Sequence, residues 1–192
     1  MTATSAPFGL RPRYSMTGPV RPQAYPYGIA SGYASGILKY QPVTMATTGV
    51  IQAATTNQDI IGVFAGWEGV DTTGRFITSD QWLANQAYNT GEVMNVYIFQ
   101  DPTIVYSIQC DGSLAQTSIG DQADFSSGIT NGSTVTGLST CTISSSLKGA
   151  GTQGQLRILE LTLNPDNAWG DAYTVVNVQI ARSQYVASKV AI

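Results

Sequence analysis

The chain has 192 residues, a formal net charge of −3 at pH 7 and a charged fraction of 11%, well below the roughly 25% of ordinary domains. The weak negative charge gives no footprint for nucleic acid or an anionic membrane, so we expect neither partner. No apolar run reaches the roughly 18–20 residues of a membrane span, and no secretory signal follows the start. We therefore expect synthesis in the cytoplasm, and a surface so poor in charge favours a protein that is covered in an assembly.

The first segment in chain order, residues 4–28 (the leader), holds five of the 8 prolines and three of the 9 basic residues, with no acidic residue. A proline-rich chain is already extended, so ordering it against a partner costs less entropy than ordering a flexible coil. Arginines and aromatic residues are also enriched at protein interfaces. We predict that residues 1–31 form an extended arm, poor in regular structure, that binds a neighbouring subunit or another protein. The alternative is that the arm packs on its own body.

The arm is expected to place Phe8 and Leu10 in an apolar pocket of the partner, while its arginines pair with acids or carbonyl groups. Burying these two side chains is worth more than forming exposed ion pairs. The predicted partner-binding residues are Phe8, Leu10, Arg11, Arg13, Tyr14, Arg21, Tyr25 and Tyr27.

After the leader, short segments rich in apolar and β-branched residues alternate with turn residues, which predicts strands. The segment 59–67 is nearly continuously apolar and contains Gly62 and Gly66, which is typical of a strand buried on both faces. Pro42 should end the strand before it, because proline favours strand ends and edges. A turn at Thr48-Gly49 should precede a further strand. The earlier predicted strand segments are 32–43, 44–54 and 59–67.

The second half of the chain has a similar pattern around a middle that is rich in Gly, Ser, Thr and Asp. Segments 92–99 and 104–110 flank Asp-Pro-Thr and predict a hairpin, and Asn131-Gly132 predicts a type I′ turn. A short helix is expected around 114–119, and two late strands at 156–163 and 173–184. Residues 32–192 are thus predicted to form a single mostly-β body, a barrel or a sandwich.

Few residues could carry chemistry. The chain has no histidine, which excludes Ser-His-Asp and Cys-His catalysis and the commonest zinc and copper ligands. No phosphate- or dinucleotide-binding motif is present, so we predict no cofactor, no bound metal and no enzymatic activity. Carboxylates alone could hydrolyse a glycan, but they lie in turn-like stretches that favour a structural role. The candidate pairs are Glu68 with Asp71, Asp121 with Asp124, and Asp166 with Asp171.

The two cysteines are too few for a disulfide framework. Cys110 lies on the same alternation face as Ile104, Tyr106 and Ile108, which predicts a buried free thiol rather than a disulfide.

Four short motifs, taken in order, resemble tailed-bacteriophage head decoration (cement) proteins: "APFGLRP", "IIGVFAGWE", "QDP" with "YSIQCDG", and "NPDNAWGDA". The resemblance covers most of the chain, with residues 112–154 covered least. It implies a β-rich virion protein that binds the outer surface of the head and clamps neighbouring major capsid proteins. It also implies self-association, with a trimer preferred to a dimer.

Two other classes stay open: a carbohydrate-binding β-module, which an exposed line of tyrosine and tryptophan would favour, and a carboxylate-based glycan hydrolase of a virion. The hydrolase would need acidic residues at strand ends on both sides of a cleft.

Overall fold

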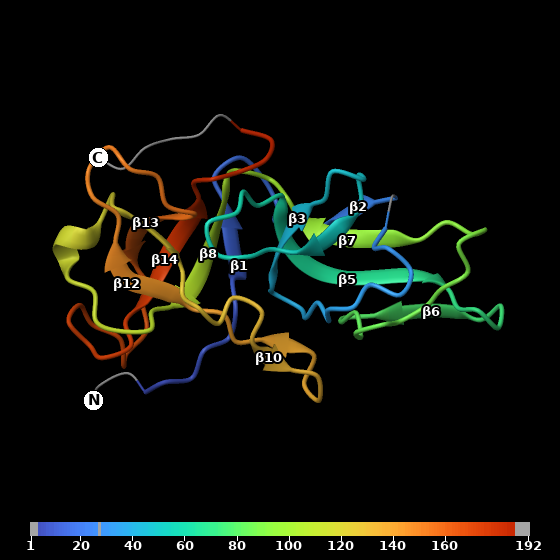
Figure 1. Ribbon diagram of the computed structural model, residues 1–192. Helices are drawn as coiled ribbons and strands as arrows, with labels where there is room; N and C mark the ends of the chain where they lie inside the picture. Colours follow the sequence, from blue (N-terminus) through green and yellow to red (C-terminus); the bar gives the residue numbers. More distant parts are fainter. Residues whose placement is uncertain (1–3, 27, 187–192) are drawn as a thin grey trace.

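The computed structural model describes residues 4–26 and 28–186 and is built almost entirely from strands (Figure 1). The predicted mostly-β fold class is confirmed. In the described part of the chain the helical element is η1 (Gln116–Ser118), a short 3-10 helix. The strands are β1 (Arg11–Ser15), β2 (Gln23–Tyr25), β3 (Pro42–Met45), β4 (Ile51–Ala53), β5 (Gly62–Val70), β6 (Phe76–Ser79), β7 (Asn95–Phe99), β8 (Ile104–Gln109), β9 (Gln122–Phe125), β10 (Gly132–Ser133), β11 (Leu138–Ser139), β12 (Ile143–Leu147), β13 (Leu156–Leu161) and β14 (Val175–Ile180).

Sheet A, on the left in Figure 1, has the antiparallel order β1-β8-β14-β13-β9-β12. The sheet is strongly curved. As a result Cys110, directly after β8, forms a backbone bridge with Ile143 at the start of β12. The alternation predicted for the last strand is confirmed, since Val176 and Val178 face the interior while Asn177 does not. The fully or nearly fully buried interior of this sheet, core A, includes Leu10, Val63, Tyr106, Ile108, Cys110, Phe125, Cys141, Ile143, Leu156, Ile158, Val176 and Val178.

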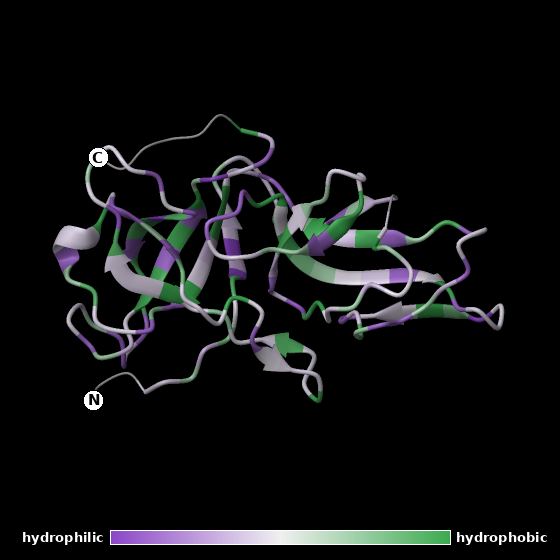
Figure 2. Cartoon of the chain, viewed as in Figure 1, coloured by the Kyte–Doolittle hydropathy of each residue, from purple (hydrophilic) through white to green (hydrophobic). Residues whose placement is uncertain are grey.

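Sheet B, on the right in Figure 1, has the order β2-β7-β5-β3-β4, and β6 pairs with β5 outside this path. Its buried face, core B, contains two tryptophans: Trp67 and Trp82 meet edge-on with ring centroids 5.1 Å apart. Such an aromatic pair is worth about 0.5–1.5 kcal/mol beyond its burial. Hydrophobic residues recur along the strands of both sheets (Figure 2).

Strand β5 joins the two cores and confirms the prediction of a strand buried on both faces. Val63 packs in core A and the next residue, Phe64, packs in core B. Both glycines are needed for close approach: a Cβ on Gly62 would lie 2.3 Å from the Phe99 carbonyl oxygen. Gly66, at φ +152°, lies at a bulge in the pairing with β7, and a Cβ there would lie 2.8 Å from a backbone oxygen. The two sheets thus form one sandwich-like arrangement.

The leader does not form an arm poor in regular structure, and that prediction is wrong. β1 pairs with β8 of sheet A, and β2 pairs with β7 of sheet B. Leu10 is fully buried in core A, a burial worth about 1.5–3 kcal/mol. Residues of the predicted arm and of the predicted body therefore share sheets and a core, because the leader's apolar side chains find partners within the chain.

Two local predictions also fail. The segment 101–103 does not close a hairpin: it carries the chain from β7 in sheet B to β8 in sheet A. Pro42 begins β3 instead of ending a strand, and the residues before it form only isolated bridges, at Ile37 and Lys39.

The middle of the chain holds more regular structure than its composition indicates. It contributes β9 and β12 to sheet A. The hairpin turn lies at residues 134–137, between β10 and β11, and not at Asn131-Gly132, where β10 begins. In contrast, the turn at Thr48-Gly49, a helical turn within 114–119, and the two late strands are confirmed.

Candidate functional site

The start of the leader is fixed to sheet A by the side chain of Gln109, at the end of β8. This side chain is buried; its Oε1 accepts a hydrogen bond from the Ala6 N–H at 2.8 Å, and its Nε2 donates to the Thr4 carbonyl at 2.9 Å. A carboxamide has one acceptor and one donor group, so it can bond an extended segment as a neighbouring strand would. The first described residues are thus bound to their own body.

The next part of the leader forms a stack of side chains. The Arg11 guanidinium carbon lies 5.3 Å from the ring centroid of Phe8 and 5.6 Å from that of Tyr40. Both distances are within the reach of a cation–π contact, worth about 0.5–1 kcal/mol at an exposed site. Phe8 is half-buried and contacts Arg11 of its own chain, while Leu10 fills core A and has no surface left to offer. Leu10 as a partner-binding residue is therefore a wrong prediction.

Tyr14 connects the leader to a polar network on the outer face of sheet A. Its hydroxyl donates to Glu160 Oε1 at 3.0 Å, and Asn177 Nδ2 donates to the same oxygen at 2.9 Å. Behind them, the buried Asn177 Oδ1 accepts from Ser107 Oγ at 2.8 Å and from Thr162 Oγ1 at 2.7 Å. Burial first, and then the hydrogen bond to Glu160, raise the pKa of Tyr14. The phenol therefore stays protonated and donating at neutral pH.

Among the exposed residues of the leader, we call the following set of charged, aromatic and thioether side chains the leader surface: Arg13, Tyr14, Met16 and Arg21. Met16 is 61% exposed and Tyr14 42%. The ion pairs of the described residues are Lys39–Asp80, Lys148–Asp124 and Arg182–Asp59. Neither Arg13 nor Arg21 has a carboxylate partner within the described ranges. The leader surface thus combines uncompensated positive charge with exposed apolar groups.

The last two predicted contact residues, Tyr25 and Tyr27, have different outcomes. Tyr25, on β2, packs against core B, and its hydroxyl lies 3.2 Å from the Gly49 carbonyl oxygen and 3.4 Å from Met45 Sδ. It is therefore largely engaged by its own chain. Tyr27 lies outside the described residues.

The first pair of candidate carboxylates serves local structure. Glu68 accepts a hydrogen bond from Asn95 Nδ2 at 2.9 Å, and this bond is the main cause that lowers the pKa of Glu68. Asp71 accepts from the hydroxyl and N–H of Thr73 and from the N–H of Arg75, which closes the turn before β6. The Thr73 hydroxyl contributes most to the lowered pKa of Asp71.

One carboxylate of each of the other two pairs is also bonded within the chain. Asp124 pairs with Lys148 and accepts from the Gln155 N–H at 3.1 Å, and Asp171 accepts from the Ala168 N–H at 2.9 Å. Throughout residues 4–26 and 28–186, no group of three or more His, Cys, Asp or Glu side chains could hold a metal ion. Asp124 and Asp171 therefore already serve bonds within the fold.

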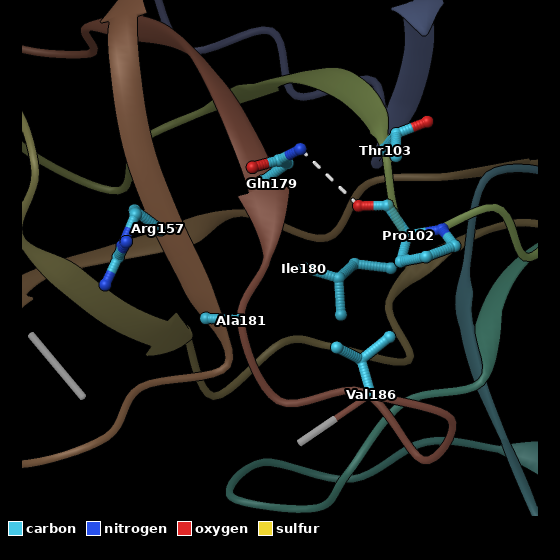
Figure 3. Close-up of a pocket in the computed structure, with 7 residues that line it drawn as sticks. All are labelled: Pro102, Thr103, Arg157, Gln179, Ile180, Ala181 and Val186. Atoms are coloured by element: carbon cyan, nitrogen blue, oxygen red, sulfur yellow. Dashed lines mark hydrogen bonds between the residues drawn. The ribbon is translucent and has the colours of Figure 1, made fainter. Parts of the chain in front are cut away.

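A pocket of about 190 Å³ lies between the turn that precedes β8 and the end of β14 (Figure 3). Ile180, Pro102 and Val186 converge in it, while Arg157 on β13 lies apart from them (Figure 3). Gln179 Nε2 donates to the Pro102 carbonyl at 3.4 Å. The lining residues that the structure describes are apolar or neutral apart from Arg157.

The three tryptophans do not form an exposed line of the kind that would favour a carbohydrate-binding module. Trp67 and Trp82 are both buried in core B, and the Trp67 indole N–H donates to the Gln81 carbonyl at 2.9 Å. Trp169 is half-buried against core A. The tryptophans therefore pack the interior.

Comparison of the chain with protein-family models, with curated proteins and with solved structures finds no match. In the part of the chain that the structure describes, no helix is long and apolar enough to cross a membrane.

Sequence reasoning named Arg13, Tyr14 and Arg21 of the leader surface, but it named neither Met16 nor the residues that anchor the segment. Gln109 and Glu160 belong to strands far along the chain, and nothing in their local sequence shows that they bond residues 4–14. The one available signal was the alternation in β8, which turns Gln109 away from core A on a strand whose residues are all buried. A buried glutamine outside the core needs a partner.

Proposed function

We propose that this chain is a structural protein of a tailed-phage head that binds the outer surface of the shell and clamps neighbouring major capsid proteins. The observation that supports this is the leader surface: no carboxylate of the described residues pairs with Arg13 or Arg21, and Tyr14 and Met16 of the same segment are exposed. Arginine, tyrosine and methionine are among the residues enriched in the centres of protein interfaces.

The way the leader is held supports a rigid binding element. β1 and β2 are edge strands of sheets A and B, and Gln109 and Leu10 fix the segment before β1. A surface that is already ordered loses little entropy on binding. The leader therefore binds as part of the folded body, and not as an arm that wraps around the partner.

The charge of the leader defines the chemistry of the partner surface. The leader carries three arginines and no acidic residue, although the whole chain is net negative at −3. Arg11 is engaged between Phe8 and Tyr40, which leaves Arg13 and Arg21 to pair with acidic side chains of the capsid protein. An apolar recess next to those acids would receive Met16.

Cosedimentation with capsids of the phage whose genome encodes the chain tests this proposal. The double variant Arg13→Ala/Arg21→Ala should weaken binding about tenfold or more, as for arginines that contribute strongly to an interface. Raising the salt concentration should also weaken binding, because it screens exposed charges. Arg182→Ala is the matched control, since Arg182 pairs with Asp59 of its own chain and lies outside both the leader and β6. Equal binding by the double variant and the wild type would overturn the proposal.

A further inference from the structure

Strand β6 lies at an open edge of sheet B, beneath β5 in Figure 1. It pairs with β5 on one side, with Val70 opposite Phe76 and Glu68 opposite Thr78. Within the described residues no strand pairs with its other side. The hairpin bond from the Asp71 N–H to the Arg75 carbonyl, at 2.9 Å, sets the alternation of the ladder.

This alternation decides which backbone groups face outward. In an antiparallel pair, hydrogen-bonded and non-hydrogen-bonded positions alternate. Because Arg75 bonds toward the β5 side, Ile77 and Ser79 also bond toward β5. Phe76 and Thr78 therefore direct their N–H and C=O groups to the open edge, and both residues are exposed.

Each of the other outer strands of the two sheets has a feature that hinders strand addition. In sheet B, β2 lies between Pro22 and Pro26, and β4 is bridged at Ile51 by Ile29. β1 contains Pro12, Arg13 and a break in its pairing register, and the pairing of β12 is also irregular. β6 reads Phe-Ile-Thr-Ser, with no proline, no charge and no bulge in its register with β5. A regular uncharged edge of this kind accepts another strand.

The side chains of β6 also lack a complete set of neighbours. Phe76 is 68% exposed, on the face it shares with Thr78. In Figure 2 the first part of this strand is hydrophobic and the rest is near neutral, at the margin of the molecule. Ile77, on the opposite face, is half-buried against core B. An added strand would cover Phe76 and extend the packing over Ile77.

We propose that β6 pairs antiparallel with β6 of a second copy of this chain, about a two-fold axis at Ile77. In this register Phe76 lies opposite Thr78 of the second copy, so that the outward N–H and C=O groups of both residues are satisfied on both chains. The two Phe76 rings become diagonal neighbours on one face, a separation that aromatic side chains can bridge.

The charges that flank β6 favour this orientation over a parallel one. Arg75 precedes the strand and Asp80 follows it. Antiparallel pairing brings the positive end of one copy to the negative end of the other, whereas parallel pairing would bring like charges together. Asp80 already bonds Lys39 at 2.7 Å, but its side chain remains 68% exposed and accessible. The strand is thus self-complementary in hydrogen bonding, shape and charge.

The proposed contact is isologous: both copies use the same strand, so the assembly is complete as a dimer. It replaces the trimer implied by the resemblance with a dimer, and it does not depend on capsid binding. A four-residue edge buries little area, so the association should be weak and concentration-dependent.

Cross-linking at the two-fold axis tests the register. Ile77 would face Ile77 of the second copy at a non-hydrogen-bonded position, with Cα atoms about 4.5 Å apart, a distance that suits a disulfide. Ile77→Cys should form a disulfide-linked dimer on mild oxidation. Val135→Cys is the control, because Val135 is 94% exposed at the tip of the β10–β11 hairpin. Native Cys110 and Cys141 are buried. Equal cross-linking of the two variants would overturn the proposal.

Hydrogen exchange on the unmodified chain gives an independent readout if Ile77→Cys fails to fold. The amides of Phe76 and Thr78 should exchange more slowly as protein concentration rises, while the amide of Val135 should not change. Thr78→Pro removes an outward N–H without breaking a bond to β5, and should raise the dimer dissociation constant about tenfold or more. Concentration-independent exchange at Phe76 and Thr78, or a trimer with these amides unprotected, would overturn the proposal.

Discussion

The carboxamide of Gln109 accepts a hydrogen bond from the N–H of Ala6 across 103 residues of sequence, at 2.8 Å. This bond, with the one to the Thr4 carbonyl, sets where the leader enters sheet A. The leader therefore depends on a side chain of β8 before its own strand pairing begins.

Gln109→Ala should lower the free energy of unfolding by about 1–3 kcal/mol, because it removes two hydrogen bonds that are each worth about 0.5–1.5 kcal/mol. Urea denaturation followed by tryptophan fluorescence would measure it. Gln116→Ala is the matched control, since Gln116 is exposed in η1, and it should change stability little. Equal effects of the two substitutions would argue that the Gln109 contacts contribute nothing.

The stability of the fold should also depend on the leader's buried anchor. Leu10→Ala should cost about 2–5 kcal/mol, as is usual for a fully buried leucine. Met16→Ala, at a 61% exposed side chain of the same segment, should be nearly neutral. Deletion of residues 1–27 should destabilise the whole body, because it removes Leu10, β1 and β2. A truncated chain with unchanged stability would restore the hypothesis of a detachable arm.

Strands whose pattern is settled by their own residues were predictable. In β5 the apolar run and its two glycines fit a strand between two cores. In β14 the alternation places Val176 and Val178 on the buried face and Asn177 on the opposite face. Each of these signals is local, because it follows from the period of side chains along a strand.

The leader could not be placed in the same way. Prolines and arginines are typical of a solvated arm, but they are also what protects an edge strand. Which of the two holds here depends on pairing with β8, about ninety residues further on, and on the cavity that Leu10 fills. The segment 101–103 poses the same problem: a turn sequence does not show whether Phe99 and Ile104 continue in one sheet or in two.

The candidate site was predictable to the extent that exposure follows from composition. Arg13, Arg21 and Tyr14 reach the surface as expected, because charged groups are rarely buried without a partner. Leu10 and Tyr25 were predicted as contact residues on their apolar character alone, and that character is equally satisfied by the chain's own cores.

Acid should loosen the junction between β1 and β8 through Asp101. Its carboxylate accepts from the Thr103 hydroxyl at 2.7 Å and from the Thr103 N–H at 2.8 Å, and also from Ser15 Oγ at the end of β1. These bonds, the Thr103 hydroxyl first, lower the pKa of Asp101. A carboxyl whose pKa is lower in the folded state contributes stability above its unfolded pKa of about 3.9, and this contribution is lost as pH falls through the folded pKa.

Asp101→Asn should therefore lower the free energy of unfolding at pH 7 and flatten its decline as pH falls below about 4. Urea denaturation across this range would measure both effects. Asp166→Asn is the control, at an exposed aspartate in the loop between β13 and β14, and should keep the wild-type pH profile. A wild-type profile in Asp101→Asn would contradict the assignment.

Both thiols should be inert in the native protein. Cys110 and Cys141 are free and buried, as the alternation of β8 predicted for Cys110. Burial raises the pKa of Cys110 to about 11 and that of Cys141 to about 12. Since the thiolate is the reactive form, a disulfide reagent at pH 8 should label neither residue until denaturant unfolds the chain, and then label both. Val135→Cys should react at once under the same conditions, because Val135 is 94% exposed. Rapid labelling of the wild-type chain without denaturant would contradict this prediction. It would mean that the interior of sheet A opens readily, although the bridge between Cys110 and Ile143 closes the sheet.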